Sequence, residues 1–202
     1  DKLARLEIIP QNVDVIAGES VQFEVRGFDR FGNPVAVTPQ YSISRPLGAL
    51  DPMGLLVAEN AGNAVVQAKA EELVAECAVA VAPAEMARAV LSPAGPIALV
   101  AGEAQMLKLS GFDKFGNTVQ AESTWEIFPA LGSIDAQGLL HPEKAGKGKI
   151  SATITQMRTG KQIEVSTDIT VAAGETTKIV VAPNPVQVVA GEEVMFESIA
   201  YD

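Results

Sequence analysis

A seven-residue motif occurs twice in this chain and constrains its fold more than any other feature. GFDRFGN occupies residues 27–33 and GFDKFGN occupies residues 111–117, which is an offset of 84 residues. The offset holds without a gap when residues 17–68 are placed on residues 101–152, where 21 of the 52 aligned positions are identical. Self-similarity at a fixed period indicates that each copy is one folding unit and that the chain is an array of such units.

A third copy begins near the end of the sequence. Gly191 aligns with Gly18, so Tyr201 and Asp202 fall on the positions of Phe28 and Asp29. The chain is therefore expected to be a section of a longer repeat protein. Two strands of an unfinished unit would expose unpaired edges, and we expect them to add to another chain or to be ordered by residues beyond them. The repeat predicts two complete modules and the first strands of a third, over residues 1–84, 85–174 and 175–202.

Alternation of apolar and polar residues predicts strands throughout each copy. Val21, Phe23 and Val25 show the period of two that places one face of a strand in a core, and Gly, Pro, Asn and Asp interrupt the pattern at short intervals. This is typical of an all-β antiparallel sandwich with about seven strands per module. In the first module we predict strands over Leu6 to Ile9 with Val13 to Ile16, Ser20 to Gly27, Val35 to Ser44, Gly48 to Leu50, Leu55 to Ala58, Ala64 to Ala70 and Leu73 to Val81.

Aromatic residues are scarce, at 5% of the chain. Tyr41 and Trp125 align with each other, and each precedes an Ile by two positions. We predict that both fill the core from a middle strand and that most Phe residues are also in the core, because a large aromatic side chain buries much apolar area.

Composition excludes several classes of function. The chain has 15 basic and 25 acidic residues, a net charge of −10, so it should repel nucleic acid and anionic lipid surfaces. No apolar run reaches the roughly 18 residues that span a bilayer, so membrane insertion is not expected. Cys77 is the only cysteine, which excludes an internal disulfide, and its place in an alternating pattern predicts a buried structural thiol.

The pentads Asp29–Asn33 and Asp113–Asn117 predict tight turns between strands. An Asp side chain can accept hydrogen bonds from backbone amides two residues on, Gly supplies a positive φ, and Asn tolerates the left-handed region. The alternative is a calcium site that uses Asp29, Asn33, Asp113 and Asn117. Calcium takes six to eight oxygen ligands and one pentad offers two or three side-chain oxygens, so the turn is favoured and calcium is the one cofactor left open.

Other candidate residues carry no chemistry that the repeat supports. Asp51 and Asp135 precede Gly54 and Gly138 in the motif LGxxDxxGLL, which predicts a second pair of turns. His141 is the only histidine, and the first copy has Val57 at its place, so we expect an exposed His rather than a member of a triad or zinc cluster. Lys147 and Lys149 lie in GKGK, which lacks the spacing of a phosphate loop.

The last hairpin is longer in the second module than in the first. Thirteen positions separate Ala68 from Val81, whereas nineteen separate Ala152 from Val171, and the extra residues fall around MRTGK at residues 157–161. An insertion is tolerated at a loop, so we predict the hairpin tip there. The linkers between modules are short, which predicts that successive modules string end to end as a semi-rigid rod.

The order of motifs resembles the bacterial immunoglobulin-like (Big) family of surface-protein repeats. The resemblance implies immunoglobulin-like sandwiches of about seven strands without a disulfide, as in intimin- and invasin-like adhesins and S-layer proteins. The family has no shared active site, so no catalytic or cofactor-binding residue and no enzyme activity is predicted. The residues that carry the resemblance are Gly18, Asp29, Gly32, Asn33, Tyr41, Asp51 and Gly54, with Gly102, Asp113, Gly116, Asn117, Trp125, Asp135 and Gly138 in the second copy.

The resemblance implies one of two functions. The first is a structural stalk, spacer or display module of a larger bacterial or archaeal cell-surface or secreted protein. The alternative is an accessory module that binds a carbohydrate or a host surface, for example beside a secreted glycoside hydrolase. Both place the chain outside the cell, with neighbouring modules of the same polypeptide as partners and a surface protein or polysaccharide as a further candidate. Exposed aromatic residues grouped on one face would favour the alternative.

Overall fold

A computed structural model describes residues 2–201, and every regular element in that range is a β-strand. The prediction of an all-β fold is confirmed. The strands of the first repeat are β1 (Arg5–Ile9), β2 (Asn12–Ile16), β3 (Ser20–Gln22), β4 (Glu24–Phe28), β5 (Pro34–Val35), β6 (Gln40–Ile43), β7 (Gly48–Leu50), β8 (Leu55–Ala58), β9 (Gly62–Ala70) and β10 (Leu73–Ala82).

The second repeat has the same order of elements except that an isolated bridge between Phe112 and Thr118 takes the place of β5, and the first strands of the third repeat follow it. Its strands are β11 (Met86–Ser92), β12 (Ile97–Val100), β13 (Gln105–Met106), β14 (Lys108–Asp113), β15 (Ala121–Phe128), β16 (Gly132–Ile134), β17 (Leu139–Pro142), β18 (Gly146–Gln156) and β19 (Gln162–Ala172). The third repeat contributes β20 (Lys178–Ala182) and β21 (Glu197–Tyr201).

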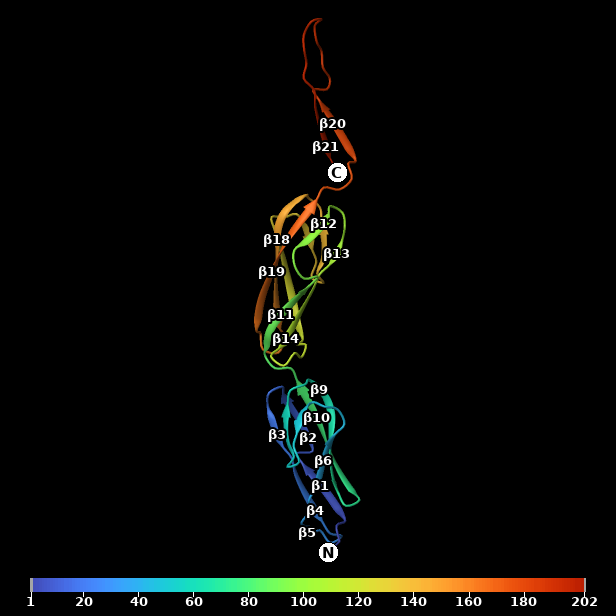
Figure 1. Cartoon of the computed structure of the whole chain (residues 1–202), viewed down its shortest axis with the longest axis vertical. Helices are drawn as coiled ribbons and strands as arrows, with labels where there is room; N and C mark the ends of the chain where they lie inside the picture. Colours follow the sequence, from blue (N-terminus) through green and yellow to red (C-terminus); the bar gives the residue numbers. More distant parts are fainter. Residues whose placement is uncertain (1, 202) are drawn as a thin grey trace. The chain divides into compact units, whose positions relative to one another are not determined.

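Each complete repeat is built from several small sheets, and many of their strands are labelled in Figure 1. In the first repeat the sheets have the orders β1-β4-β5, β2-β10-β9-β6 and β3-β8-β7. In the second they have the orders β11-β14, β12-β19-β18-β15 and β13-β17-β16. The long hairpins are antiparallel, as β9 with β10, whereas β2 pairs with β10 and β12 with β19 in parallel. One parallel pair in each repeat is a feature that alternation alone does not predict.

Alternate residues of the central strands build the core of the first repeat. Val66 on β9 and Cys77 on β10 are completely buried, and they pack with Phe23, Leu47 and Leu56. Burying one side chain of the size of Phe or Leu stabilises a fold by about 2 kcal/mol. The buried residues of the corresponding cluster in the second repeat are Ile97, Leu107, Leu131, Leu140, Ile150, Ile169 and Val171.

The chain divides into two compact units. Unit 1 consists of Asp1–Ala89, Ser110–Glu122 and Thr155–Gln162, and unit 2 consists of Val90–Leu109, Ser123–Ile154 and Ile163–Asp202. Unit 1 therefore contains the pentads of both repeats, together with the tip of the β18–β19 hairpin. The domain boundaries that we derived from the repeat stay a prediction.

Short breaks divide several predicted strands. The strand predicted over Ser20 to Gly27 is interrupted at Phe23, whose amide donates to the carbonyl of Gly54 at 2.8 Å, so β3 joins one sheet and β4 joins another. Leu107 and Gly138 make the same contact at 2.8 Å in the second repeat. In the first repeat the chain changes sheets at the buried residue Phe23. The observed strands are therefore shorter than the strand that the alternating pattern predicts.

The aromatic residues differ in part from the prediction. Tyr41 and Trp125 do pack against the two cores, but β6 and β15 are edge strands of their sheets rather than middle strands. Most Phe residues are not in the core either: Phe23 is 1% exposed, whereas Phe31 and Phe128 are 72% and 81% exposed. Turns and strand ends carry these aromatics, which alternation within strands cannot place.

The third repeat begins with the same pairing as the first. β20 pairs antiparallel with β21 with Lys178 opposite Tyr201, and β1 pairs with β4 with Arg5 opposite Phe28. Every residue of β20 and β21 is exposed. Asp202, which we aligned with Asp29, lies outside the described residues.

Candidate functional site

The pentad of the second repeat is a turn held by one buried carboxylate. Asp113 is 1% exposed, and its Oδ1 accepts hydrogen bonds from the amides of Phe115 and Asn117, both at 2.9 Å. Gly116 has a φ of +91°, which glycine adopts without strain. The predicted turn is therefore present. Among the described residues Glu71 is the one non-glycine residue with a positive φ, so Asn117 serves through its side chain instead.

The second oxygen of Asp113 and the side chain of Asn117 reach residues of the first repeat within unit 1. Asp113 Oδ2 accepts from Asn117 Nδ2 at 2.8 Å and from the amide of Ala84 at 2.9 Å. Asn117 Nδ2 also donates to the carbonyl of Glu59 at 2.7 Å, and its Oδ1 accepts from the amide of Ala61 at 2.8 Å. The pentad thus closes its own turn and also holds a loop and a linker residue.

Phe115 completes this contact with an apolar surface. Its ring packs against the core cluster of the first repeat, and a Cβ atom placed on Gly18 would lie 3.2 Å from two ring atoms. Lys114 Nζ lies 4.8 Å from the centroid of the same ring, a distance at which a cation is attracted to the aromatic face. Gly18 has a φ of +100°, so glycine is needed there both for the backbone and for the approach of the ring.

The pentad of the first repeat makes the same turn with fewer partners. Asp29 Oδ1 accepts from the amides of Phe31 at 2.8 Å and Asn33 at 2.9 Å, and Oδ2 accepts from Asn33 Nδ2 at 3.0 Å. Gly32 has a φ of +88°. The turn is therefore a local product of the motif, whereas the further contacts of Asp113 and Asn117 depend on their surroundings.

Hydrogen bonds lower the pKa of both aspartates. Burial raises the pKa of Asp113, but donation from Asn117 Nδ2 and from the amides of Ala84, Asn117 and Phe115 outweighs burial and holds the pKa below the ordinary 3.8. For Asp29 the side chain of Asn33 is the largest cause and lowers the pKa, while burial opposes it. Both carboxylates are therefore ionised at neutral pH and act as acceptors.

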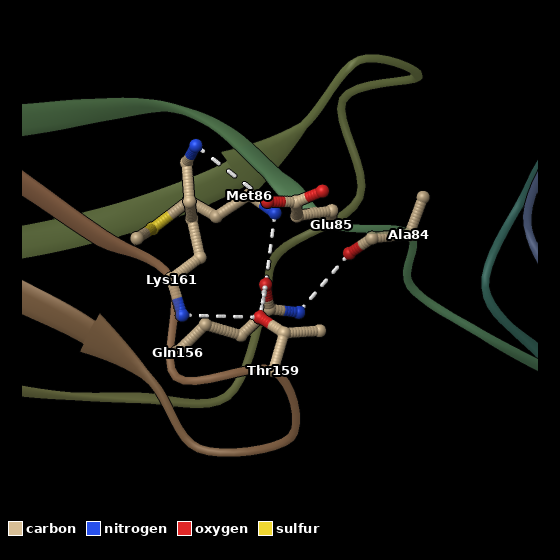
Figure 2. Close-up of polar contacts among 6 residues, drawn as sticks. All are labelled: Ala84, Glu85, Met86, Gln156, Thr159 and Lys161. Atoms are coloured by element: carbon tan, nitrogen blue, oxygen red, sulfur yellow. Dashed lines mark hydrogen bonds and ion pairs between the residues drawn. The ribbon is translucent and has the colours of Figure 1, made fainter.

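A second group of hydrogen bonds holds the linker that follows β10, as Figure 2 shows. The buried side chain of Gln156 accepts from the amide of Met86 at 2.8 Å through Oε1 and donates to the carbonyl of Ala84 at 3.1 Å through Nε2. Thr159 donates to the same Oε1 at 2.8 Å, which orients the amide. The amide oxygen and the amide nitrogen of Gln156 therefore each hydrogen-bond the backbone of the linker segment, at Met86 and at Ala84.

The residues around Gln156 add to this contact. Arg158 donates to the carbonyl of Pro83 at 2.8 Å, and Lys161 lies 3.6 Å from Glu85 in an exposed ion pair. Exposed ion pairs contribute little, from zero to about 1 kcal/mol. The backbone hydrogen bonds of Gln156 therefore supply most of the restraint on the linker.

Sequence reasoning located this hairpin tip and missed its role. Residues 157–161 do form the predicted turn between β18 and β19. We treated the insertion as variation that a loop tolerates, whereas Arg158, Thr159 and Lys161 contact the linker or support Gln156. The length difference between the two aligned hairpins could have predicted this role, because the longer hairpin of the second repeat can contact residues that the shorter one cannot.

The LGxxDxxGLL motifs form the predicted second pair of turns. Asp51 Oδ1 accepts from the amides of Met53 and Leu55 at 2.9 and 2.8 Å, and Asp135 Oδ1 accepts from Gln137 and Leu139 at the same distances. A Cβ atom placed on Gly54 would lie 2.6 Å from the ring of Tyr41, so the motif also leaves room for the aromatic residue beside the core.

The structure does not bring the remaining candidates together. His141 is exposed on β17, as predicted. Cys77 is buried on β10, as predicted, and burial raises the pKa of its thiol. Among residues 2–201 there is no group of three or more His, Cys, Asp or Glu side chains that could hold a metal ion. Calcium binding by Asp29, Asn33, Asp113 and Asn117 stays an untested alternative to the turn. No helix in the same range is long and apolar enough to span a membrane.

Comparisons with solved structures identify the fold. A structure of InvD from Yersinia pseudotuberculosis matches 98% of this chain and 69% of that chain, with 17% identity and a TM-score of 0.51. The S-layer protein SbsC, domains 1–6, matches 90% of this chain with 15% identity and a TM-score of 0.43, and human protocadherin-24 EC1-2 matches 85% of this chain and all of that chain, with 12% identity and a TM-score of 0.39. This chain spans 29% of the SbsC structure.

These matches support a fold class and not a sequence family. The likeness to InvD confirms tandem immunoglobulin-like β-sandwiches as the fold class. No protein-family model matches the sequence, and no curated protein matches it either. Membership of the Big family therefore stays a prediction.

Proposed function

We propose that these repeats are non-catalytic structural modules that space or display another part of a larger cell-surface or secreted protein of a bacterium or archaeon, of the adhesin or S-layer type. The observation that carries the proposal is the restraint on the linker after β10. The amide of Ala84 donates a hydrogen bond to Asp113, and its carbonyl accepts one from Gln156. The amide of Met86 also donates a hydrogen bond to Gln156. A spacer transmits position only if its linkers are held, because a flexible linker lets successive modules reorient.

The chemistry of the described residues supports the same proposal. Asp113, a buried carboxylate, accepts four N–H donors and has no place for a substrate. The exposed aromatics lie in three separate segments of the sequence, at Phe31, at Phe128 and at Phe196 with Tyr201. Binding of a carbohydrate or host surface therefore stays the untested alternative.

Two measurements test the proposal. Small-angle X-ray scattering should show an elongated particle, and a compact particle would contradict a spacing role. Spin labels on Lys69→Cys and Glu164→Cys, both exposed positions, should give one narrow distance distribution. Cys77 is buried and should not react.

A matched pair of variants connects this distribution to the linker. Gln156→Ala should broaden it, because two backbone groups of the linker lose their partner. Gln162→Ala removes a glutamine of the same hairpin whose side chain bonds Thr155 rather than the linker, so it should leave the distribution unchanged. Equal broadening by the two variants would refute the role of Gln156.

A further inference from the structure

The pentad Asp29–Asn33 has the same internal geometry as Asp113–Asn117 but an open outer surface. Phe31 is 72% exposed, whereas Phe115 packs on a core. Arg30 lies 4.4 Å from the centroid of the Phe31 ring, as Lys114 does over Phe115 at 4.8 Å. Within the described part of the chain, the side chain of Asn33 bonds Asp29 alone. A preformed turn thus presents an aromatic ring and an amide side chain whose oxygen accepts no hydrogen bond among the described residues.

The hollow beside Phe31 has only one of the two walls that enclose the equivalent hollow at the second pentad. The open one is lined by Lys2, Leu3 and Arg30, among others. Their repeat equivalents Glu85, Met86 and Lys114 line a hollow whose opposite wall is Ala17, Gly18 and Glu19. The wall that the first pentad lacks is therefore known: it is a turn of the Gly18 type.

This receiving turn recurs in the second repeat. The amide of Gly102 donates to the carbonyl of Pro142 at 2.8 Å, as Gly18 does to Ala58 at 2.7 Å. The φ of Gly102 is +90°, and a Cβ atom on it would meet nothing within 4 Å. The turn keeps its shape whether or not an aromatic ring covers it, so it belongs to the module itself. Any further module of this repeat is expected to carry it.

We propose that Asp29–Asn33 is a docking surface for a preceding immunoglobulin-like module of the same polypeptide. The Gly18-type turn of that module covers Phe31, and its loop equivalent to Glu59–Ala61 bonds the side chain of Asn33. The second oxygen of Asp29 accepts the amide of the linker, as Asp113 accepts that of Ala84. This inference rests on the proposed spacing function and names the surface by which a neighbouring module is held.

The test uses the full chain with one module added before it. Residues 1–85 are fused to residues 3–202, which keeps the register because Leu3 then takes the place of Met86, just as Arg5 over Phe28 corresponds to Arg88 over Phe112. Thr38→Ser, at an exposed position of the added copy, distinguishes the two peptides that contain Phe31 by mass. Hydroxyl-radical footprinting then measures how fast each Phe31 is oxidised. We expect Phe31 of the original part to be oxidised several-fold more slowly than in the 202-residue chain, and Phe31 of the added copy to be unchanged. Equal rates for the original Phe31 in the two chains would overturn the proposal.

A second variant identifies the covering surface. Gly18→Val in the added copy should restore rapid oxidation of the original Phe31, because the larger side chain occupies the position of the ring. Continued protection of Phe31 would overturn the role of the turn. The same substitution changes the mass of the peptide that contains Phe23, so slow oxidation of that buried residue shows that the added copy is folded.

Scattering from the extended chain separates this proposal from the proposed function. A longer particle in which Phe31 stays exposed would overturn the docking surface and leave the spacing role intact. A compact particle in which Phe31 is covered would overturn the spacing role and leave the docking surface supported.

Discussion

The two pentads differ at one residue, Arg30 against Lys114, and yet have different surroundings. Both close a turn on an aspartate that accepts two backbone amides and one asparagine side chain. Asp113 additionally accepts the amide of Ala84, and Asn117 bonds a loop of the first repeat. The motif therefore builds the turn locally, and residues of the first repeat add the further contacts of the second pentad.

The largest difference is expected from removal of the two aspartates. Asp113→Ala leaves four N–H donors without their acceptor in a buried site, so the free energy of unfolding should fall by about 3 kcal/mol. Asp29→Ala leaves three N–H donors without their acceptor, and none of the three belongs to a linker, so its effect should be smaller. Urea unfolding followed by circular dichroism measures both. Equal losses would show that the contact with Ala84 contributes nothing.

A pair of glycines tests the aromatic contact. Gly18→Ala and Gly102→Ala both place a side chain at a positive φ, which costs about 1 kcal/mol. Gly18→Ala also crowds the ring of Phe115 and should cost about 1 kcal/mol more. The extra cost should disappear when Phe115→Ala is introduced, as a double-mutant cycle of melting curves would show. Persistence of the difference would contradict the assignment to the ring.

The pH dependence should follow the hydrogen bonds of Asp113. Its pKa is lower in the folded state than in the unfolded state, so its ionised form stabilises the fold fully above the ordinary pKa of about 4. This stability is lost as the pH falls through the lower folded pKa. Asp113→Asn should flatten the dependence of the melting temperature on pH between about pH 4 and pH 3. A flat wild-type profile in that range would contradict the lowered pKa.

The smallest effect is expected from calcium. The carboxylate oxygens of Asp29 and Asp113 accept N–H groups, and a cation would have to displace these donors. Melting curves in calcium and in chelator should therefore coincide. A higher melting temperature in calcium that is lost in Asp29→Ala would support the calcium alternative instead.

Much of the local structure follows from residue type and spacing. Asp at the first position and Gly at the fourth position of a pentad predict the turn, since the carboxylate and the positive φ act within five residues. Alternation around Cys77 predicts its burial in the same way. The interruption of the strand at Phe23 does not follow, because it depends on the carbonyl of Gly54, which lies 31 residues further along the chain.

By itself, the sequence determined the repeat, the all-β class and the turns. The turns and the alternation depend on residues close together in the chain, and the same residues recur in the second copy. Tertiary structure alone decided which pentad contacts another repeat, where the strands change sheets, and that Gln156 hydrogen-bonds the linker. These features depend on groups far apart in the chain that folding brings together. Asp113 and Asp29 begin nearly identical motifs, and the amide of Ala84, the loop at Glu59–Ala61 and the turn at Gly18 distinguish their surroundings.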